Sequence, residues 1–196
     1  MAETRRGRIA FVPPRYGADV VGGSEAVSRE AAHGLAARGW EVEVLTTAAR
    51  DHYTWRNEYP TGATEVDGLI VRRFPVVKAS STVARDRIER RIQLGQSTTI
   101  EEQLVWANGL FRVPDLFHHL VTSGREYRAL VFSPYLFWTT IVCSAVAPER
   151  SIIIPCLHAE KYAELELFKP LLSNPAAVWF LSEPEHQLGH RLSRLP

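Results

Sequence analysis

The sequence predicts an α/β domain with a doubly wound, mostly parallel sheet and helices on both faces. Six short apolar runs have the length of strands, and several lack polar alternation, as strands covered on both faces do. Segments with helical spacing lie between them, so strands and helices alternate along the chain. The runs are residues 9–12, 42–46, 69–74, 130–133, 152–155 and 178–181.

The segment after the first run is the clearest helix. Val27, Ala31 and Leu35 recur at intervals of four, which places them on one helical face, and Gly39 follows as a helix-ending residue. The spacing predicts a helix over about residues 24–38.

Two later segments complete the domain. In residues 76–126, a group of arginines precedes several apolar positions. We expect two or three helices there, inserted before the fourth strand. Residues 183–195 predict one final helix. The long connection at residues 49–67 is expected to be a loop whose Tyr53, Trp55 and Arg56 either line a ligand site or anchor the loop to the domain.

Composition narrows the class of protein. The chain has 196 residues, 45% of them hydrophobic, which suits one domain with a substantial core. A net charge of +1 does not provide the basic surface that nucleic-acid binding needs. Cys143 and Cys156 lie in apolar stretches, which favours buried free thiols in a reducing cytosol. We expect a soluble, cytoplasmic protein, because the first apolar run is too short for a signal peptide or a membrane span.

A glycine turn between the first strand and the first helix is the main chemical feature. Gly22, Gly23 and Ser24 would lie at the carboxyl end of the sheet, where free N–H groups at a helix start favour phosphate. The alternative is an ordinary turn with Ser24 or Gly23 as the N-cap. For Arg15 and Tyr16, contact with phosphate or acceptor competes evenly with solvent-exposed positions.

The turn does not fit two common nucleotide sites. A dinucleotide site needs a tight G-x-G-x-x-G turn and an acidic residue closing the second strand, but that strand ends Leu45-Thr46-Thr47. NAD is therefore disfavoured. The sequence also lacks the G-x-x-x-x-G-K-[ST] pattern of P-loop NTPases.

Seven segments together resemble family 4 retaining glycosyltransferases of the GT-B fold. The resemblance runs in the right order over nearly the whole chain, so it is more specific than any single motif. It rests on Arg8-Ile-Ala-Phe-Val-Pro-Pro, Val21-Gly-Gly-Ser-Glu25, Leu35-Ala-Ala-Arg-Gly-Trp-Glu-Val-Glu-Val-Leu-Thr-Thr47, Tyr53-Thr-Trp-Arg-Asn-Glu58, Gly68-Leu-Ile-Val-Arg-Arg-Phe-Pro75, Pro155-Cys-Leu-His-Ala-Glu160 and Phe180-Leu-Ser-Glu183.

The resemblance implies that residues 1–196 form the N-terminal, acceptor-side Rossmann-like domain. Such enzymes hold most of the nucleotide sugar in a C-terminal domain with a Glu-x7-Glu pattern, which these residues lack, so we expect this domain alone to be inactive. The expected reaction transfers a hexose from a nucleotide-diphosphate sugar to a saccharide or lipid-linked acceptor with retention, without a cofactor, in polysaccharide or cell-envelope synthesis. A peripheral position at the inner membrane face is left open.

Two other classes of function stay open. One is a non-catalytic half that binds an acceptor or lipid carrier and needs a partner chain for chemistry. The weaker one is a different nucleotide-binding α/β enzyme, such as an epimerase-type protein, whose fingerprint is absent.

Three further candidates lie after the last two predicted strands. The resemblance implies that His158 faces the cleft and contacts the sugar or the acceptor; the alternative is a hydrogen-bonded histidine that fixes a loop. Glu160 is expected to open a helix. Its carboxylate there either contacts the ligand or only interacts favourably with the helix dipole. Ser182 binds substrate or caps the last helix.

No metal site is expected. His186 and His190 are four apart, and His118 and His119 are adjacent, but neither pair has an identifiable third ligand. The arginines of residues 85–91 are interleaved with acidic residues, which favours a solvated helix face over a membrane contact.

Overall fold

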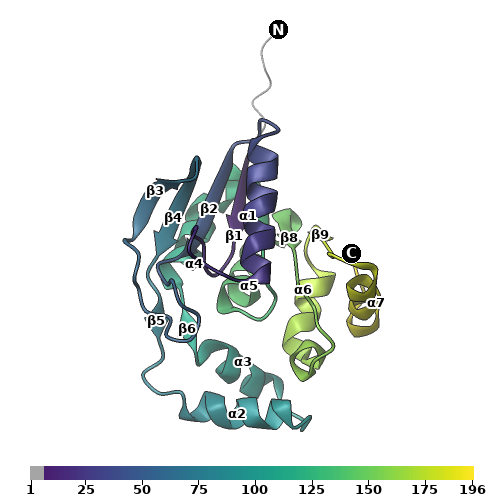
Figure 1. Ribbon diagram of the computed structural model, residues 1–196. Coiled ribbons are helices and arrows are strands. Elements are labelled where there is room, and N and C mark those ends of the chain that lie inside the picture. The colour runs from purple at the N-terminus through teal and green to yellow at the C-terminus, as the bar shows by residue number, and fades with distance from the viewer. Residues whose placement is uncertain (1–6) are drawn as a thin grey trace.

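The computed structural model describes residues 7–196 and confirms the predicted fold class (Figure 1). Seven strands form one sheet in the order β3-β4-β2-β1-β7-β8-β9. All its pairings are parallel except that of β3 with β4. The strands are β1 Arg8–Val12, β2 Val42–Thr47, β3 Gly62–Val66, β4 Leu69–Phe74, β7 Tyr127–Phe132, β8 Ser151–Ile153 and β9 Ala177–Val178. Each of the six predicted runs contains or overlaps one strand.

The sheet changes its direction of winding at β1. The chain passes from β1 to β2 and β4 on one side, then returns to β7, β8 and β9 on the other. Both neighbours of β1 run parallel to it. In such a sheet the loops at the carboxyl ends separate at the switch point and leave room for a ligand.

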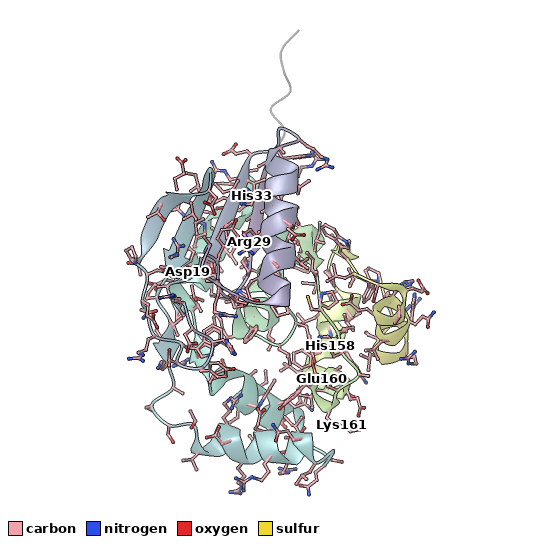
Figure 2. All side chains as sticks on the ribbon, in the orientation of Figure 1. Asp19, Arg29, His33, His158, Glu160 and Lys161 are labelled. Atoms are coloured by element: carbon pink, nitrogen blue, oxygen red, sulfur yellow. The ribbon has the colours of Figure 1, made fainter. Side chains whose placement is uncertain are left out.

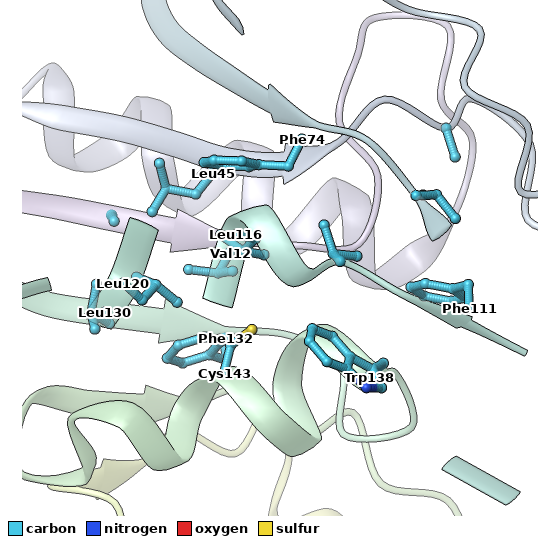
Figure 3. Packing of buried hydrophobic residues seen from close by; sticks show 14 of the residues in the cluster. Val12, Leu45, Phe74, Phe111, Leu116, Leu120, Leu130, Phe132, Trp138 and Cys143 are labelled. Carbon is cyan, nitrogen blue, oxygen red and sulfur yellow. The ribbon is translucent and has the colours of Figure 1, made fainter. Parts of the chain in front are cut away.

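Helices cover both faces, which explains the unbroken apolar runs of the inner strands. Ile9 and Phe11 of β1 pack with α1 (Gly23–Ala36) on one face. Ala10 and Val12 point to the other face and pack with α4 (Pro114–Ser123) and α5 (Trp138–Cys143) (Figure 3). Alternate residues of one strand therefore belong to two different cores.

The first helix is followed by the left-handed glycine that its sequence predicts. Gly39 has a positive φ of 80°, and the N–H of Trp40 donates to the carbonyl of Leu35 at 3.2 Å. This closes the helix with a left-handed glycine. The helix itself ends at Ala36, two residues earlier than expected.

Residues 76–126 contain three α-helices, within the two or three helices expected. They are α2 (Val83–Gln93), α3 (Ile100–Asn108) and α4. Two short strands, β5 (Val77–Lys78) and β6 (Phe111–Arg112), were not predicted; they pair and join the α2–α3 arm to the domain. Figure 1 shows this arm beyond the carboxyl ends of the strands.

The expectation of a loop throughout residues 49–67 is wrong, because β3 lies within it. Asp67 and Gly68 both have positive φ, 50° and 78°, and close a hairpin between β3 and β4. Trp55 is 2% exposed and stacks on Phe111 with ring centroids 4.0 Å apart, so it anchors the loop. Tyr53, in contrast, is 82% exposed.

The last third of the described chain is made of short elements. Two helices, α6 (Lys169–Ser173) and α7 (Glu183–Leu192), flank β9, and α7 is three residues shorter than expected. Cys143 is buried as predicted, but Cys156 is only half-buried, because it lies on a loop beyond β8. Among residues 7–196, no helix is both long enough and apolar enough to span a bilayer.

Candidate functional site

A groove of about 610 Å³ lies at the carboxyl end of the sheet. Three segments border it: the start of α1, the loop after β8, and α7 with the two residues before it. It brings together four residues proposed from the sequence, namely Gly23, Ser24, His158 and Ser182. The remaining lining residues are Val27, Cys156, Leu157, Ala159, Leu181, Pro184, Glu185, Leu188 and Arg191.

The two glycines of the turn have different roles. Gly22 is the N-cap of α1, so the alternative that placed Ser24 or Gly23 at this position is wrong. A Cβ on Gly22 would clash with the carboxylate of Glu25, whereas a Cβ on Gly23 would meet nothing within 4 Å. A side chain at Gly22 would therefore force the Glu25 carboxylate to shift, whereas Gly23 leaves open space where the turn borders the groove.

Arg15 and Tyr16 are buried, so the solvent-exposed alternative is wrong for both. The guanidinium of Arg15 forms an ion pair with Glu25, and it donates to the carbonyl of Arg50 at 3.2 Å. Burial raises the pKa of Tyr16. The Arg15–Glu25 pair joins the loop after β1 to the first turn of α1, and so supports the glycine turn from behind.

His158 is exposed on the loop after β8 and lines the groove. Figure 2 shows it near the start of α1. Within residues 7–196, the structure gives its imidazole no hydrogen-bond partner, which argues against a histidine that fixes its own loop. Both ring nitrogens are therefore available to a ligand.

Glu160 precedes a short 3₁₀ turn, Lys161–Glu164, rather than opening an α-helix. Its Oε1 accepts a hydrogen bond from the hydroxyl of Tyr135 at 2.7 Å, and the backbone N–H of Tyr135 donates to Pro155 at 3.1 Å. Burial and the neighbouring Glu160 carboxylate raise the pKa of Tyr135. Tyr135 therefore holds both ends of the loop that carries His158.

Ser182 caps α7, as one of its two interpretations predicted: its hydroxyl accepts from the N–H of Glu185 at 3.3 Å. Glu185 itself was not identified from the sequence. It is 7% exposed, and its carboxylate accepts from the N–H of Leu157 at 2.8 Å and of Leu181 at 2.7 Å. The Ser-x-x-Glu spacing of a capping box was the available signal.

The histidine pairs make other contacts. His186 and His190 lie 3.0 Å apart between their Nε2 atoms, and His119 contacts the hydroxyl of Tyr127 at 3.1 Å. Residues 7–196 contain no group of three or more side chains that could hold a metal ion.

The arginines of α2 lie among acidic residues, as the sequence indicated. Arg85 forms ion pairs with Asp86 at 3.2 Å and Glu89 at 3.1 Å. Arg91 pairs with Glu102 of α3. The Arg91–Glu102 pair ties α2 to α3, whereas both pairs of Arg85 lie within α2.

The groove combines two kinds of surface. The first N–H groups of α1 lack intrahelical acceptors, and this helix start borders the groove together with Arg191. The start of α7 offers fewer free donors, because Ser182 already caps it. Val27, Leu157 and Leu188 supply an apolar wall. Such a surface suits a ligand with an anionic group and a less polar body.

Comparisons with known proteins support the fold. No protein-family model matches this sequence. No curated protein matches it either. Among solved structures, a sucrose-phosphate synthase from Thermosynechococcus elongatus aligns over 96% of this chain and 84% of that chain, with a TM-score of 0.51 and 14% identity. At this identity the similarity shows the fold alone, a Rossmann-like α/β domain.

Proposed function

We propose that this chain is the acceptor-side half of a glycosyltransferase that takes its sugar from a nucleotide-diphosphate sugar. The observation that supports this most is the meeting of Gly23, Ser24, His158 and Ser182 around one groove. These residues come from three distant parts of the sequence, and the family resemblance implied for one of them, His158, a contact with the sugar or the acceptor.

In the proposed reaction the donor lies in the groove with its phosphates next to the start of α1. Gly23 leaves room there for close approach of the ligand, and the helix dipole favours the negative charge. The imidazole of His158 would hydrogen-bond the sugar or the acceptor hydroxyl. Most phosphate contacts would come from a second domain, in the same or a partner chain.

We further propose that transfer occurs with retention. In this scheme the acceptor hydroxyl attacks the anomeric carbon, the bond to the leaving phosphate breaks, and that phosphate takes the acceptor's proton. The described residues would supply position and oriented dipoles rather than a nucleophile. This would let His158 assist without forming a covalent intermediate.

Titration of the chain with UDP-glucose and GDP-mannose, followed by ¹⁵N NMR, tests the proposal. We expect shifts at Gly23, Ser24, His158 and Ser182 with dissociation constants weaker than about 100 μM, because most donor contacts are assigned elsewhere. Affinity of about 1 μM or better, near 8 kcal/mol, would make this half the donor site instead. Shifts confined to residues outside the groove would refute the proposal.

A further inference from the structure

A second cavity, of about 570 Å³, lies between α4 and the end of α5 with the two 3₁₀ turns that follow it. We call it the α4–α5 cavity. Arg125 and Glu149 line it, and each lies two residues before a strand, β7 and β8 respectively. The cavity is therefore at the amino end of the sheet, away from the groove at His158, and the two share no lining residue.

Helix α4 has a second apolar face toward this cavity. Leu116 and Leu120 are buried and belong to the core (Figure 3). Four residues at the spacing i, i+3, i+4 and i+7 line the cavity, namely Phe117, Leu120, Val121 and Gly124. Phe117 is 38% exposed and Val121 is 56% exposed. An apolar stripe that continues from the core to the surface of a helix indicates a contact with another molecule.

Small residues border the cavity on both sides. Gly124 lies on the α4 side, and Ala145 lies on the other side with the partly buried Val142 and Val146. A Cβ on Gly124 would contact only the Cβ of Leu120, at 4.0 Å. Because small side chains allow close approach, a second helix can lie here with its apolar residues in the cavity.

The rim of the cavity carries one charge of each sign. The side chain of Arg125 is exposed and has no acceptor among residues 7–196. Glu149 is an exposed carboxylate whose partner, the Nε of Arg150, is 3.7 Å away, too far for a hydrogen bond. The same guanidinium donates to the carbonyls of Arg125 at 2.9 Å and Tyr127 at 3.0 Å. Both rim charges are therefore available to a partner that carries the complementary pair.

We propose that the α4–α5 cavity is the interface through which two copies of this chain form a symmetric dimer. The protruding Phe117 and Val121 and the cavity lie on one surface, as an interface between identical faces requires. The apolar face of each α4 fills the cavity of the other copy. At the rim, Arg125 of each copy pairs with Glu149 of the other, so one two-fold axis forms both pairs.

A second copy fits this surface better than a strongly charged partner does. The two rim charges cancel, and the chain has a net charge of only +1, so self-association meets little repulsion. The interface leaves the groove at His158 open in both copies, because it lies at the other end of the sheet. The dimer goes beyond the proposed function and does not depend on it.

Sedimentation velocity of the chain from roughly 1 to 500 μM tests the dimer. We expect a monomer–dimer equilibrium with a dissociation constant of about 10–100 μM, as is usual for interfaces below the standard size of about 800 Å² per partner. Val121→Arg should weaken the dimer at least roughly tenfold, because it places a charge in the apolar contact. Val83→Arg is the matched control: it makes the same change at a valine of α2 that is 75% exposed, and should have no effect.

Charge reversal tests the pairing across the two-fold axis. Arg125→Glu and Glu149→Arg should each weaken the dimer roughly tenfold, since each variant brings like charges together at both contacts. The double variant should restore the wild-type dissociation constant. All variants should keep the wild-type melting temperature at about 1 μM, where the monomer predominates.

Three outcomes would overturn the proposal. A chain that stays monomeric at about 500 μM would leave the cavity to a different protein segment. A dimer that Val121→Arg does not weaken would use another surface. A double charge variant as weak as the single ones would exclude the symmetric Arg125–Glu149 pairing.

Discussion

The carboxylate of Glu185 and the backbone N–H of Leu157 lie 2.8 Å apart, although they come from α7 and from the loop after β8. The second oxygen of the same carboxylate accepts from Leu181 at 2.7 Å. One buried side chain therefore sets the spacing of two walls of the groove. His158 follows directly after Leu157, so its position depends on a residue 27 positions away in the sequence.

Replacement of Glu185 by glutamine should destabilise the protein. The amide NH₂ would face one of the two backbone N–H groups in place of an acceptor, leaving a buried donor unsatisfied, at a cost of about 1–3 kcal/mol. Urea unfolding measures this loss, and the NMR signals of the His158 imidazole should shift as well. Glu183→Gln is the matched control, since Glu183 lies on the same helix with 71% of its side chain exposed. Equal stability of the two variants would contradict the assigned role.

Replacement by alanine should change the stability of the protein at Gly22 but not at the adjacent Gly23. In Gly22→Ala the new methyl group would displace the Glu25 carboxylate from its pair with Arg15, and we expect a loss of about 1–3 kcal/mol. Gly23→Ala should fold with wild-type stability, because a Cβ there has no atom within 4 Å. Thermal unfolding of both variants checks this pair of outcomes.

A larger group at Gly23 separates folding from binding. Gly23→Val should still fold, although its side chain would occupy open space next to the groove that the proposed ligand needs. We expect weaker UDP-glucose binding with a nearly unchanged melting temperature. Binding at the wild-type level would show that the donor does not approach this turn.

The sequence predicted the sheet because parallel strands covered on both faces leave a strong signal. It did not predict β3, whose residues are mostly exposed and lack an apolar pattern. The Asp67-Gly68 dipeptide between Val66 and Leu69 was a usable hairpin signal, since both residues adopt positive φ. At the site, single residues such as His158 could be proposed from local motifs.

Partners across the chain could not be predicted in the same way. The pairs Arg15–Glu25 and Tyr135–Glu160 depend on where separate loops meet, and nothing in local spacing encodes that. Glu185 is intermediate: its position in a Ser-x-x-Glu sequence indicated a cap, but its bonds to Leu157 and Leu181 follow only from the tertiary structure.

Stability should fall in mild acid because of His119. Burial first, and then the nearby Arg72, lower the pKa of this imidazole, while Glu43 and Glu126 oppose the shift. A lowered pKa means that the folded state favours the neutral ring. The resulting stabilisation of the fold is fully present above the unfolded pKa of about 6.5, and it is lost as pH falls through the folded pKa. The hydroxyl of Tyr127 donates to Glu43, so His119 should donate from Nε2 to Tyr127.

Urea midpoints at pH 7.5 and 5.5 measure this effect. The urea midpoint should decrease less between pH 7.5 and pH 5.5 in His119→Gln than in the wild type, because glutamine keeps an amide donor but does not titrate. His118→Gln is the control, because His118 is exposed on the neighbouring position of α4. An equal decrease in the wild type and His119→Gln would assign the acid sensitivity to other groups.

His158→Ala should separate catalysis from stability. Because the imidazole is exposed and the structure gives it no hydrogen-bond partner within residues 7–196, its removal should change unfolding free energy by less than about 0.5 kcal/mol. In the full enzyme, loss of a contact that strengthens in the transition state should lower kcat/KM by roughly 10- to 1000-fold. Donor affinity should change less than in Gly23→Val, since the turn next to the phosphates stays intact. Normal turnover with a lower melting temperature would instead make His158 a loop-stabilising residue.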